Sequence, residues 1–407
     1  MVHTLRVVQE VITLLHEGEP ISVYAHVGAH ICLLSMHAGF VPEPLSLKNV
    51  TIDRSALAEA CGKAINDSRL SVAMILIRRV DSNLYYRYLG NQNSEEAAET
   101  WSSSKIFCES ASAQRLRGEN CTHRSGLDSF TDGKHGPTPL GDLSTVIASY
   151  DETAGYTSNS LAAYFGVTLA GKKRLGTLVD SWLNAGQEET LGGHYGEDPP
   201  SDLANTSMKF SPDRTPNWCT VEEEKAEPYV ENHLSPLTAA EWLRRLVLHR
   251  ETSHQLPGVE WDDVKNILYG ATNSTLFGPT LLAGGMTVST DLFVQSGVPN
   301  MTEMQHQSGG AWRLFSKLGA GYSSSRHKGE ILTNAYACLP VLQKGSDDTH
   351  GDMHDASRHA VAERGVEFVL SARASVAGDT GLVEAQRVLQ EGVSCVTRAA
   401  YEGKLFK

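Results

Sequence analysis

The sequence predicts an α+β fold in which strands from both ends of the chain form one antiparallel sheet, packed with helices and joined to a mainly helical subdomain. Short runs rich in β-forming residues lie near both ends of the chain. Between them, apolar residues recur at helical spacing, and they do so again in the closing segment. The strand candidates are residues 71–79, 84–89, 310–318, 329–339 and 366–372.

The elements follow in a clear order. A helix over 55–65 precedes the first two strands, which a short turn connects, and another helix begins near residue 102. Residues 192–228 are polar and rich in proline, which predicts a long irregular loop. The expected division is an N-terminal extension of unassigned role (1–52), a sheet subdomain (53–105 and 300–407) and a mainly helical subdomain (106–299), the last two forming one domain over 53–407.

Composition narrows the classes of partner. The chain has 407 residues and a net charge of -13, which disfavours nucleic acid and anionic membranes as partners. No apolar run reaches the roughly 18 residues that a membrane span needs. We therefore expect a small-molecule substrate, no nucleic acid, no membrane span, no cofactor and a monomeric protein.

The first chemical motif is W-S-S-S-K, residues 101–105. It follows two strands and opens a helix, so Ser102 and Lys105 lie one turn apart on the same helix face. A serine hydroxyl is a weak nucleophile until a base takes its proton, and a lysine with a lowered pKa can be that base. The motif alone also suits an ordinary solvated helix start.

Two further motifs follow in the chain. Thr157-Ser158-Asn159 precedes a segment with helical spacing, where Thr157 also suits a helix N-cap. The stretch K-L-G-A-G-Y-S-S-S-R, residues 317–326, has the composition of a glycine-rich β-hairpin, and Gly319 permits a close approach to the strand edge.

Together these motifs resemble the class A β-lactamases of the penicillin-recognising superfamily, over about residues 53 to 407. The first two motifs lie 157 − 102 = 55 residues apart and the last two 317 − 157 = 160. The resemblance implies a β-lactamase/transpeptidase-like fold. The family pattern has a serine where this chain has Thr157, an aspartate where it has Ser158, and a hydroxyl residue where it has Leu318.

The resemblance also implies roles for the matching residues. Ser102 is the nucleophile, Lys105 is its base, and the Thr157 hydroxyl relays a proton to the leaving nitrogen. The remaining residues bind the substrate: Asn159 holds its carbonyl, Gly319 admits it to the strand edge, the backbone N–H of Ala320 completes the oxyanion hole with that of Ser102, and Lys317 and Arg326 bind its carboxylate.

The base for deacylation is open at this stage. The family has a glutamate in a W-E-P-x-x-N setting, and an ungapped count places Cys219 there. A shortened loop places Glu227 there instead, which we take as the fourth catalytic residue, and the acidic run 222–224 offers further candidates. With a cysteine at this position we expect slow deacylation.

We expect a serine hydrolase that acts through an acyl-enzyme on a β-lactam or a related amide or ester that carries a carboxylate. The alternatives are a serine glutaminase or D-Ala-D-Ala peptidase of the same fold, and an inactive ligand-binding homologue. The resemblance implies a secreted or periplasmic protein, although the first residues form no clear signal peptide. The His-rich run 350–359 fits no standard zinc pattern, and we expect no metal.

Overall fold

The computed structural model describes residues 39–44, 46–80, 83–118, 126–133, 136–149, 155–182, 189–203, 207–211, 219–222, 229–270, 292–298, 313–340 and 365–406. Within them, a seven-stranded sheet is built from both ends of the chain, in the order β1-β4-β3-β13-β12-β11, with β2 parallel to β4. The predicted fold class is therefore confirmed. The strands are β1 (Val41–Pro42), β2 (Ile52–Asp53), β3 (Leu70–Val80), β4 (Asn83–Gly90), β11 (Arg313–Ser323), β12 (Lys328–Pro340) and β13 (Gly365–Ala377).

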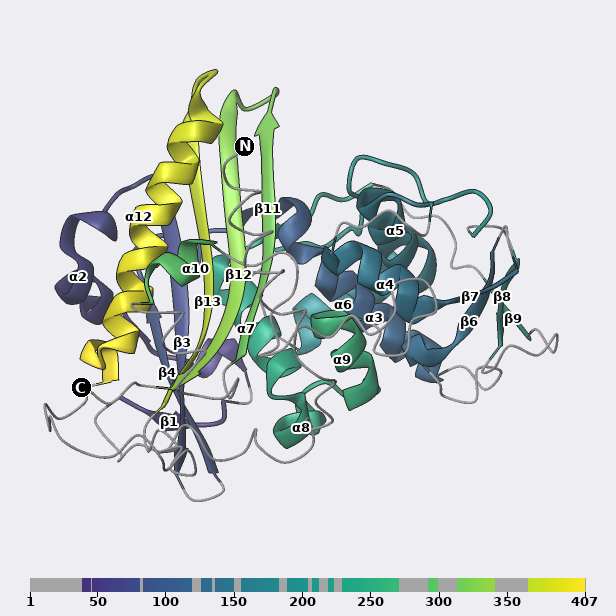
Figure 1. Cartoon of the computed structure of the whole chain (residues 1–407), viewed down its shortest axis with the longest axis horizontal. Helices are drawn as coiled ribbons and strands as arrows, with labels where there is room; N and C mark the ends of the chain where they lie inside the picture. Colours follow the sequence, from purple (N-terminus) through teal and green to yellow (C-terminus); the bar gives the residue numbers. More distant parts are fainter. Residues whose placement is uncertain are drawn as a thin grey trace, which may run out of the picture.

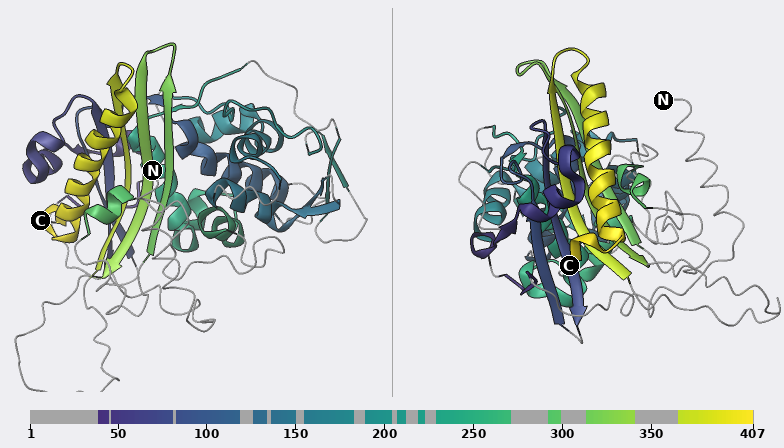
Figure 2. Two further views of the ribbon diagram at one scale, coloured as in Figure 1. Left: turned by 45° about the horizontal axis from the view of Figure 1, so that its top comes forward. Right: turned by 90° about the vertical axis from the view of Figure 1, so that its left-hand side faces the viewer.

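The sheet separates two hydrophobic cores. Side chains of β3 alternate between them, because successive residues of a strand point to opposite faces. Val72, Met74 and Leu76 enter one core, and Ile75 and Ile77 enter the other. Helices α2 (Ser55–Cys61) and α12 (Gly381–Tyr401) cover the first face, and α7 (Pro236–Val247) packs against the second, as Figures 1 and 2 show.

The middle of the chain forms the mainly helical part beside the sheet (Figure 1). Trp242 of α7 stacks on Phe107 of α3 with ring centroids 4.5 Å apart, which fixes α3 against the core beside the sheet. The helices not yet named are α3 (Lys105–Gly118), α4 (Leu140–Ser149), α5 (Ser158–Ala163), α6 (Lys172–Thr177), α8 (His249–Thr252), α9 (Trp261–Tyr269) and α10 (Leu292–Ser296).

A second, four-stranded sheet lies at the far end of the helical part (Figure 1). Its strands are β6 (Phe130–Gly133), β7 (Gly136–Pro139), β8 (Ser207–Ser211) and β9 (Cys219–Glu222). Two of them fall inside the segment predicted to be irregular, so this segment contains regular structure. A two-stranded ribbon pairs β5 (Ala98–Glu99), which lies just before the Ser102 motif in sequence, with the distant β10 (His233–Leu234).

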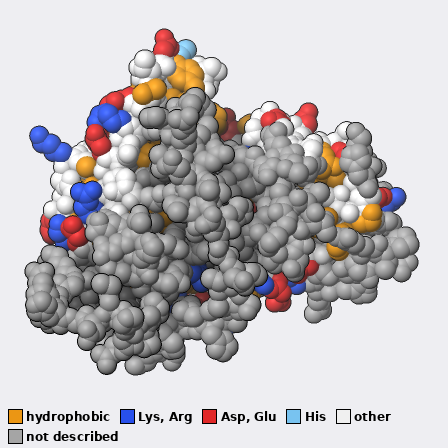
Figure 3. All heavy atoms as spheres, in the orientation of Figure 1, with side chains coloured by type: hydrophobic (Ala, Val, Ile, Leu, Met, Phe, Trp, Pro, Cys, Tyr) orange, Lys and Arg blue, Asp and Glu red, His pale blue; other side chains and the backbone are white. Residues whose placement is uncertain are grey.

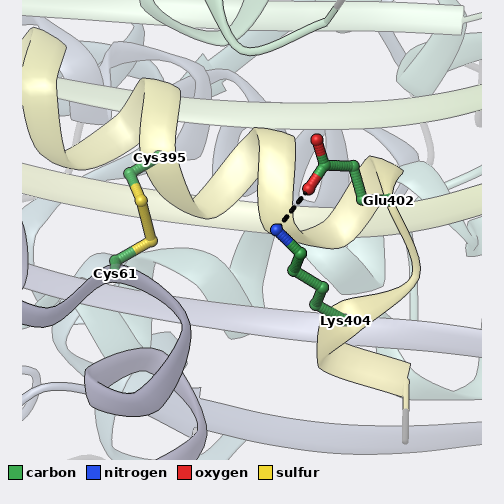
Figure 4. The surroundings of a disulfide bond; sticks show 4 residues. All are labelled: Cys61, Cys395, Glu402 and Lys404. Carbon is green, nitrogen blue, oxygen red and sulfur yellow. Dashed lines mark ion pairs between the residues drawn. A yellow bond between two sulfur atoms is a disulfide. The ribbon is translucent and has the colours of Figure 1, made fainter.

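A disulfide joins the two chain ends on the α12 side of the sheet. Cys61 at the end of α2 bonds to Cys395 of α12 (Figure 4). Cys108 is a buried thiol outside this disulfide. Basic and acidic side chains lie side by side over the α12 region in Figure 3, and Arg387 pairs with Glu384 at 2.6 Å there.

The first 38 residues and the His-rich run 350–359 lie outside the described residues. Two short strands of the predicted extension, β1 and β2, pair with β4 at the sheet edge. In the part of the chain that the structure describes, no helix is long and apolar enough to cross a membrane.

Candidate active site

Ser102 lies in a single turn of 3₁₀ helix, η3 (Trp101–Ser104), that leads directly into α3. The turn is fixed from both sides: the Thr100 N–H donates to the Asn232 carbonyl at 2.9 Å, and the Asn334 amide donates to the Ser103 carbonyl at 3.0 Å. Trp101 has a φ of 47°, an unusual value for a bulky residue. Such strain persists only where the surroundings impose it, and it often marks a functional segment.

Lys105 starts α3 and is completely buried. Its ammonium Nζ donates to the Asn159 Oδ1 at 2.6 Å and to the Ser158 Oγ at 3.1 Å. Burial lowers the pKa of Lys105 to about 8, against the raising effect of the Glu197 and Glu109 carboxylates. About a tenth of the side chain is therefore an uncharged amine at pH 7, the form that can accept a proton, against less than a thousandth for an ordinary lysine.

The start of α5 faces Lys105. Thr157 caps this helix, because its hydroxyl accepts the N–H of Ser160 at 3.1 Å. The same hydroxyl donates to the Glu197 carboxylate, and the Asn159 amide donates to the other Glu197 oxygen at 3.2 Å. Glu197 thus connects the Thr157 and Asn159 side chains beside Lys105.

Sequence analysis missed Glu197. The ungapped count from α7 carried the glutamate position to Cys219, but β9 begins there and pairs with β8 in the small sheet, far from β11 (Figure 1). Glu227 lies outside the described residues. The available signal was Glu197-Asp198-Pro199, a glutamate shortly before a proline, at the start of the long polar segment.

Strand β11 approaches the Ser102 turn closely. A Cβ added to Gly319 would lie 2.7 Å from the Ser103 nitrogen, 2.8 Å from the Thr100 oxygen and 3.0 Å from the Ser102 nitrogen. Ala320 follows at an exposed position of the strand. Only glycine permits this approach, which brings the Ala320 segment of β11 close to the backbone N–H of Ser102.

Two buried ionisable groups, Lys317 and Glu109, lie near this site, and burial favours the neutral form of each. Lys317 of β11 is fully buried, and desolvation, together with the charge of Lys105, holds its pKa well below the ordinary value. Glu109 lies one turn beyond Lys105 and accepts the Ser144 hydroxyl at 2.6 Å. Burial raises the pKa of Glu109 to about 8, and Ser144, Lys317 and Lys105 oppose this rise.

Arg326 lies in the turn between β11 and β12, where two carboxylates share its guanidinium. Nη2 is 2.5 Å from Glu99 Oε2 and 2.7 Å from Glu330 Oε2. Glu330 also accepts the Trp101 indole N–H at 3.1 Å. A substrate carboxylate at Arg326 would have to replace one of these existing partners.

Tyr195 completes the surroundings of Lys105. Its hydroxyl lies 3.0 Å from Ser104 Oγ and 3.3 Å from Cys108 Sγ, and its ring lies 5.5 Å from Lys105 Nζ. The aromatic ring provides an apolar wall beside the amine. Among the described residues, no group of three His, Cys, Asp or Glu side chains could hold a metal ion.

No family model matches the chain, and no curated protein matches it. Solved structures similar to it include a β-lactamase from Xanthomonas campestris, at 12% identity and a TM-score of 0.41, covering 85% of this chain and 96% of that one. A representative of class A β-lactamase from Bacteroides cellulosilyticus matches at 9% identity and a TM-score of 0.43, covering 86% and 98%. PBP-A matches at 10% identity and a TM-score of 0.42, covering 88% and 98%.

Proposed function

We propose that the protein is a serine hydrolase that forms an acyl-enzyme on a β-lactam or a related amide or ester. The observation that carries the proposal is the state of Lys105. This lysine is completely buried one turn after Ser102, its amine is bonded to Asn159, and burial lowers its pKa to about 8. A solvated helix start would leave the lysine exposed and fully charged.

In the acylation step, the neutral Lys105 amine takes the Ser102 proton while Oγ attacks the substrate carbonyl carbon. The oxyanion that forms accepts the N–H groups of Ser102 and Ala320, a pairing that the close approach at Gly319 supports. The C–N or C–O bond then breaks, and the leaving atom takes up the proton that Lys105 accepted from Ser102, relayed through the Thr157 hydroxyl, so that Lys105 returns to its neutral form.

For deacylation we propose Glu197 as the general base that activates the attacking water. Its carboxylate bonds to Thr157 and to Asn159, and its charge acts on Lys105. Fast turnover is then possible without Cys219, whereas the sequence alone predicted slow deacylation. Glu227 remains the general base predicted from the sequence, so Glu227→Gln is the variant to compare with Glu197→Gln.

We further propose that Arg326, with Lys317 buried beneath it, forms the anionic-substrate end of the site. Arg326 makes the contact with the carboxylate, because Lys317 is fully buried and its pKa lies well below the ordinary value. Arg326 already pairs with Glu99 and Glu330, so binding requires exchange of a partner. Glu99 is the partner to be replaced, because its side chain is more exposed than that of Glu330. Carboxylate-bearing substrates would then lose affinity in Arg326→Gln, and neutral esters would lose little.

Covalent labelling tests the proposal. A fluorescent penicillin or a fluorophosphonate should label the wild-type protein and should not label Ser102→Ala. The matched control is Ser103→Ala, whose buried hydroxyl donates to the Thr100 carbonyl at 2.6 Å and has no proposed chemical role. Labelling that survives Ser102→Ala contradicts the nucleophile, and a folded wild type that neither probe labels favours the inactive binding homologue.

A further inference from the structure

A cavity of about 650 Å³ lies at one end of the large sheet, and Arg326 is part of its wall. Its walls are the segment before the Ser102 turn and the adjoining ends of β3, β12 and β13, and its mouth carries the exposed side chains of Ser68, Glu96 and Lys328. Neither Ser102 nor Lys105 lines it. Its volume is in the range of small-molecule sites.

Arg373 of β13 is a buried cation in the wall of this cavity. It is only 5% exposed, and its Nη2 donates to the Ser71 hydroxyl at 3.2 Å. Its Nη1 has no hydrogen-bond partner among the described residues. A buried guanidinium with unused donors costs free energy unless an anion pairs with it, so this side chain is incompletely satisfied.

The nearest carboxylate holds Arg373 only loosely. Glu96 Oε2 lies 3.7 Å from the Arg373 Nη2, beyond hydrogen-bond distance, and the Glu96 side chain is 64% exposed. Glu96 therefore occupies the approach to Arg373 from the cavity mouth, and it can move into solvent at little cost.

The other arginines of the wall are already paired. Arg326 bonds to Glu99 and Glu330, and Arg69 bonds to Asp67 at 2.7 Å and to Glu384 at 2.9 Å. Arg373 is thus the least satisfied guanidinium of the lining, and Lys328 adds positive charge at the mouth.

We propose that this cavity binds a small carboxylate-bearing molecule, whose carboxylate pairs with Arg373 in the place that Glu96 now approaches. A planar carboxylate suits a guanidinium, which offers two parallel N–H donors. The carboxylate belongs either to a free small acid or to an extension of the proposed acyl substrate. The site itself does not depend on acyl transfer, so its test is independent of Ser102.

Calorimetric titration with succinate tests the site on the full chain. The wild type binds succinate, and Arg373→Gln weakens binding about tenfold or more, because a charge-assisted pair is lost. Glu96→Gln strengthens binding, since it removes a competing carboxylate at an exposed position. The matched control Arg387→Gln changes an exposed arginine of α12 outside the lining and leaves binding unchanged.

Several results would overturn the proposal: no binding to the wild type, equal binding to Arg373→Gln, or binding lost in Arg326→Gln and kept in Arg373→Gln. Tighter binding of inorganic phosphate than of succinate overturns the choice of a carboxylate. Should Arg373→Gln not fold, Glu96→Gln decides, and unchanged or weaker binding contradicts the site.

Two further arms separate the proposals and the source of the ligand. Ser102→Ala binds succinate as the wild type does, even if the acyl-transfer proposal fails. Competition between succinate and penicillin labelling of Ser102 identifies the carboxylate as part of the substrate, and labelling that succinate leaves unchanged identifies a free acid. Either result supports the site.

Discussion

At the scale of single residues, opposing effects at buried groups set the chemistry of the site. Burial lowers the pKa of Lys105 from its ordinary 10.5 to about 8, and the Glu197 and Glu109 carboxylates limit this change. Without the carboxylates the amine would be neutral at still lower pH. Without burial it would be charged at every physiological pH and could not act as a base.

The rate of acylation should follow the neutral form of Lys105. The amine loses its proton as the pH rises, so the rate should reach half its maximum near pH 8 and level off about one pH unit higher. Glu109→Gln removes a carboxylate that raises the pKa of Lys105, so the rising limb should move to lower pH.

Stopped-flow labelling with a fluorescent penicillin between pH 5 and 10 measures this profile. Glu59→Gln is the control, because Glu59 is an exposed carboxylate of α2 outside the site. A limb that stays in place, or that moves to higher pH in Glu109→Gln, would show that Glu109 does not act on the base.

Deacylation should depend on Glu197. Glu197→Gln keeps the hydrogen-bonding shape but cannot take a proton from water, so the acyl-enzyme should accumulate and its hydrolysis should slow by about 10²- to 10⁴-fold. Mass spectrometry of the intact protein after a penicillin pulse measures the acylated fraction over time.

The comparison variants are Glu227→Gln and Cys219→Ala, the two positions that sequence counting favoured. Both should deacylate as the wild type does. An acyl-enzyme that persists in Glu227→Gln and turns over normally in Glu197→Gln would transfer the role of base to Glu227.

At the scale of elements, the close contact between β11 and the Ser102 turn depends on Gly319. Gly319→Ala should push the strand and the turn apart, because the new Cβ would meet three backbone atoms at 3.0 Å or less. Misplacement of the oxyanion donors should slow acylation on the order of 10²-fold.

The control is Gly176→Ala in α6, where nothing lies within 4 Å of the new Cβ. The measurement is the rate of covalent labelling of both variants, with their thermal stability checked to be equal. Gly319→Ala that is labelled as fast as Gly176→Ala would contradict this geometry.

The sequence predicted the strands that carry strong apolar patterns. The expected strand over 329–339 corresponds to β12, but β13 runs five residues beyond its predicted end at 372. That extension carries the polar residues Arg373 and Ser375, which pair with β12 in the structure. In the sequence these polar residues interrupt the apolar run, so the strand was predicted to end before them. The small sheet was missed because β6 and β7 are short and rich in glycine and proline, and because β6 pairs with the distant β8.

The candidate site residues also divide into those that the sequence predicted and those that it did not. Ser102 and Lys105 were predicted as site residues from their spacing on one helix face, and Thr157 and Asn159 from the resemblance of their motif to that of the family. Glu197 and Arg373, which we propose from the structure, were not predicted, since their contacts join elements that are far apart in the chain. A count without gaps also cannot locate a residue across a segment that contains inserted strands.

At the scale of the whole molecule, the Cys61–Cys395 disulfide connects α2, the first α-helix of the described residues, to α12, the last one. It bridges 334 residues of sequence, so it restricts the unfolded chain strongly. Removing it should lower the free energy of unfolding by about 2–5 kcal/mol. Cys61→Ser and Cys395→Ser should each lose this amount, and the double variant should lose no more than either single one, because both changes remove the same bond.

Urea unfolding with and without a reductant measures the loss: the wild type should be sensitive to the reductant and Cys61→Ser should not. Cys338→Ser, at a half-buried cysteine outside this disulfide, is the control that keeps the reductant effect. A wild type whose unfolding midpoint does not change on reduction would show that the link between α2 and α12 adds no stability, and that the two helices are held by their packing on the sheet alone.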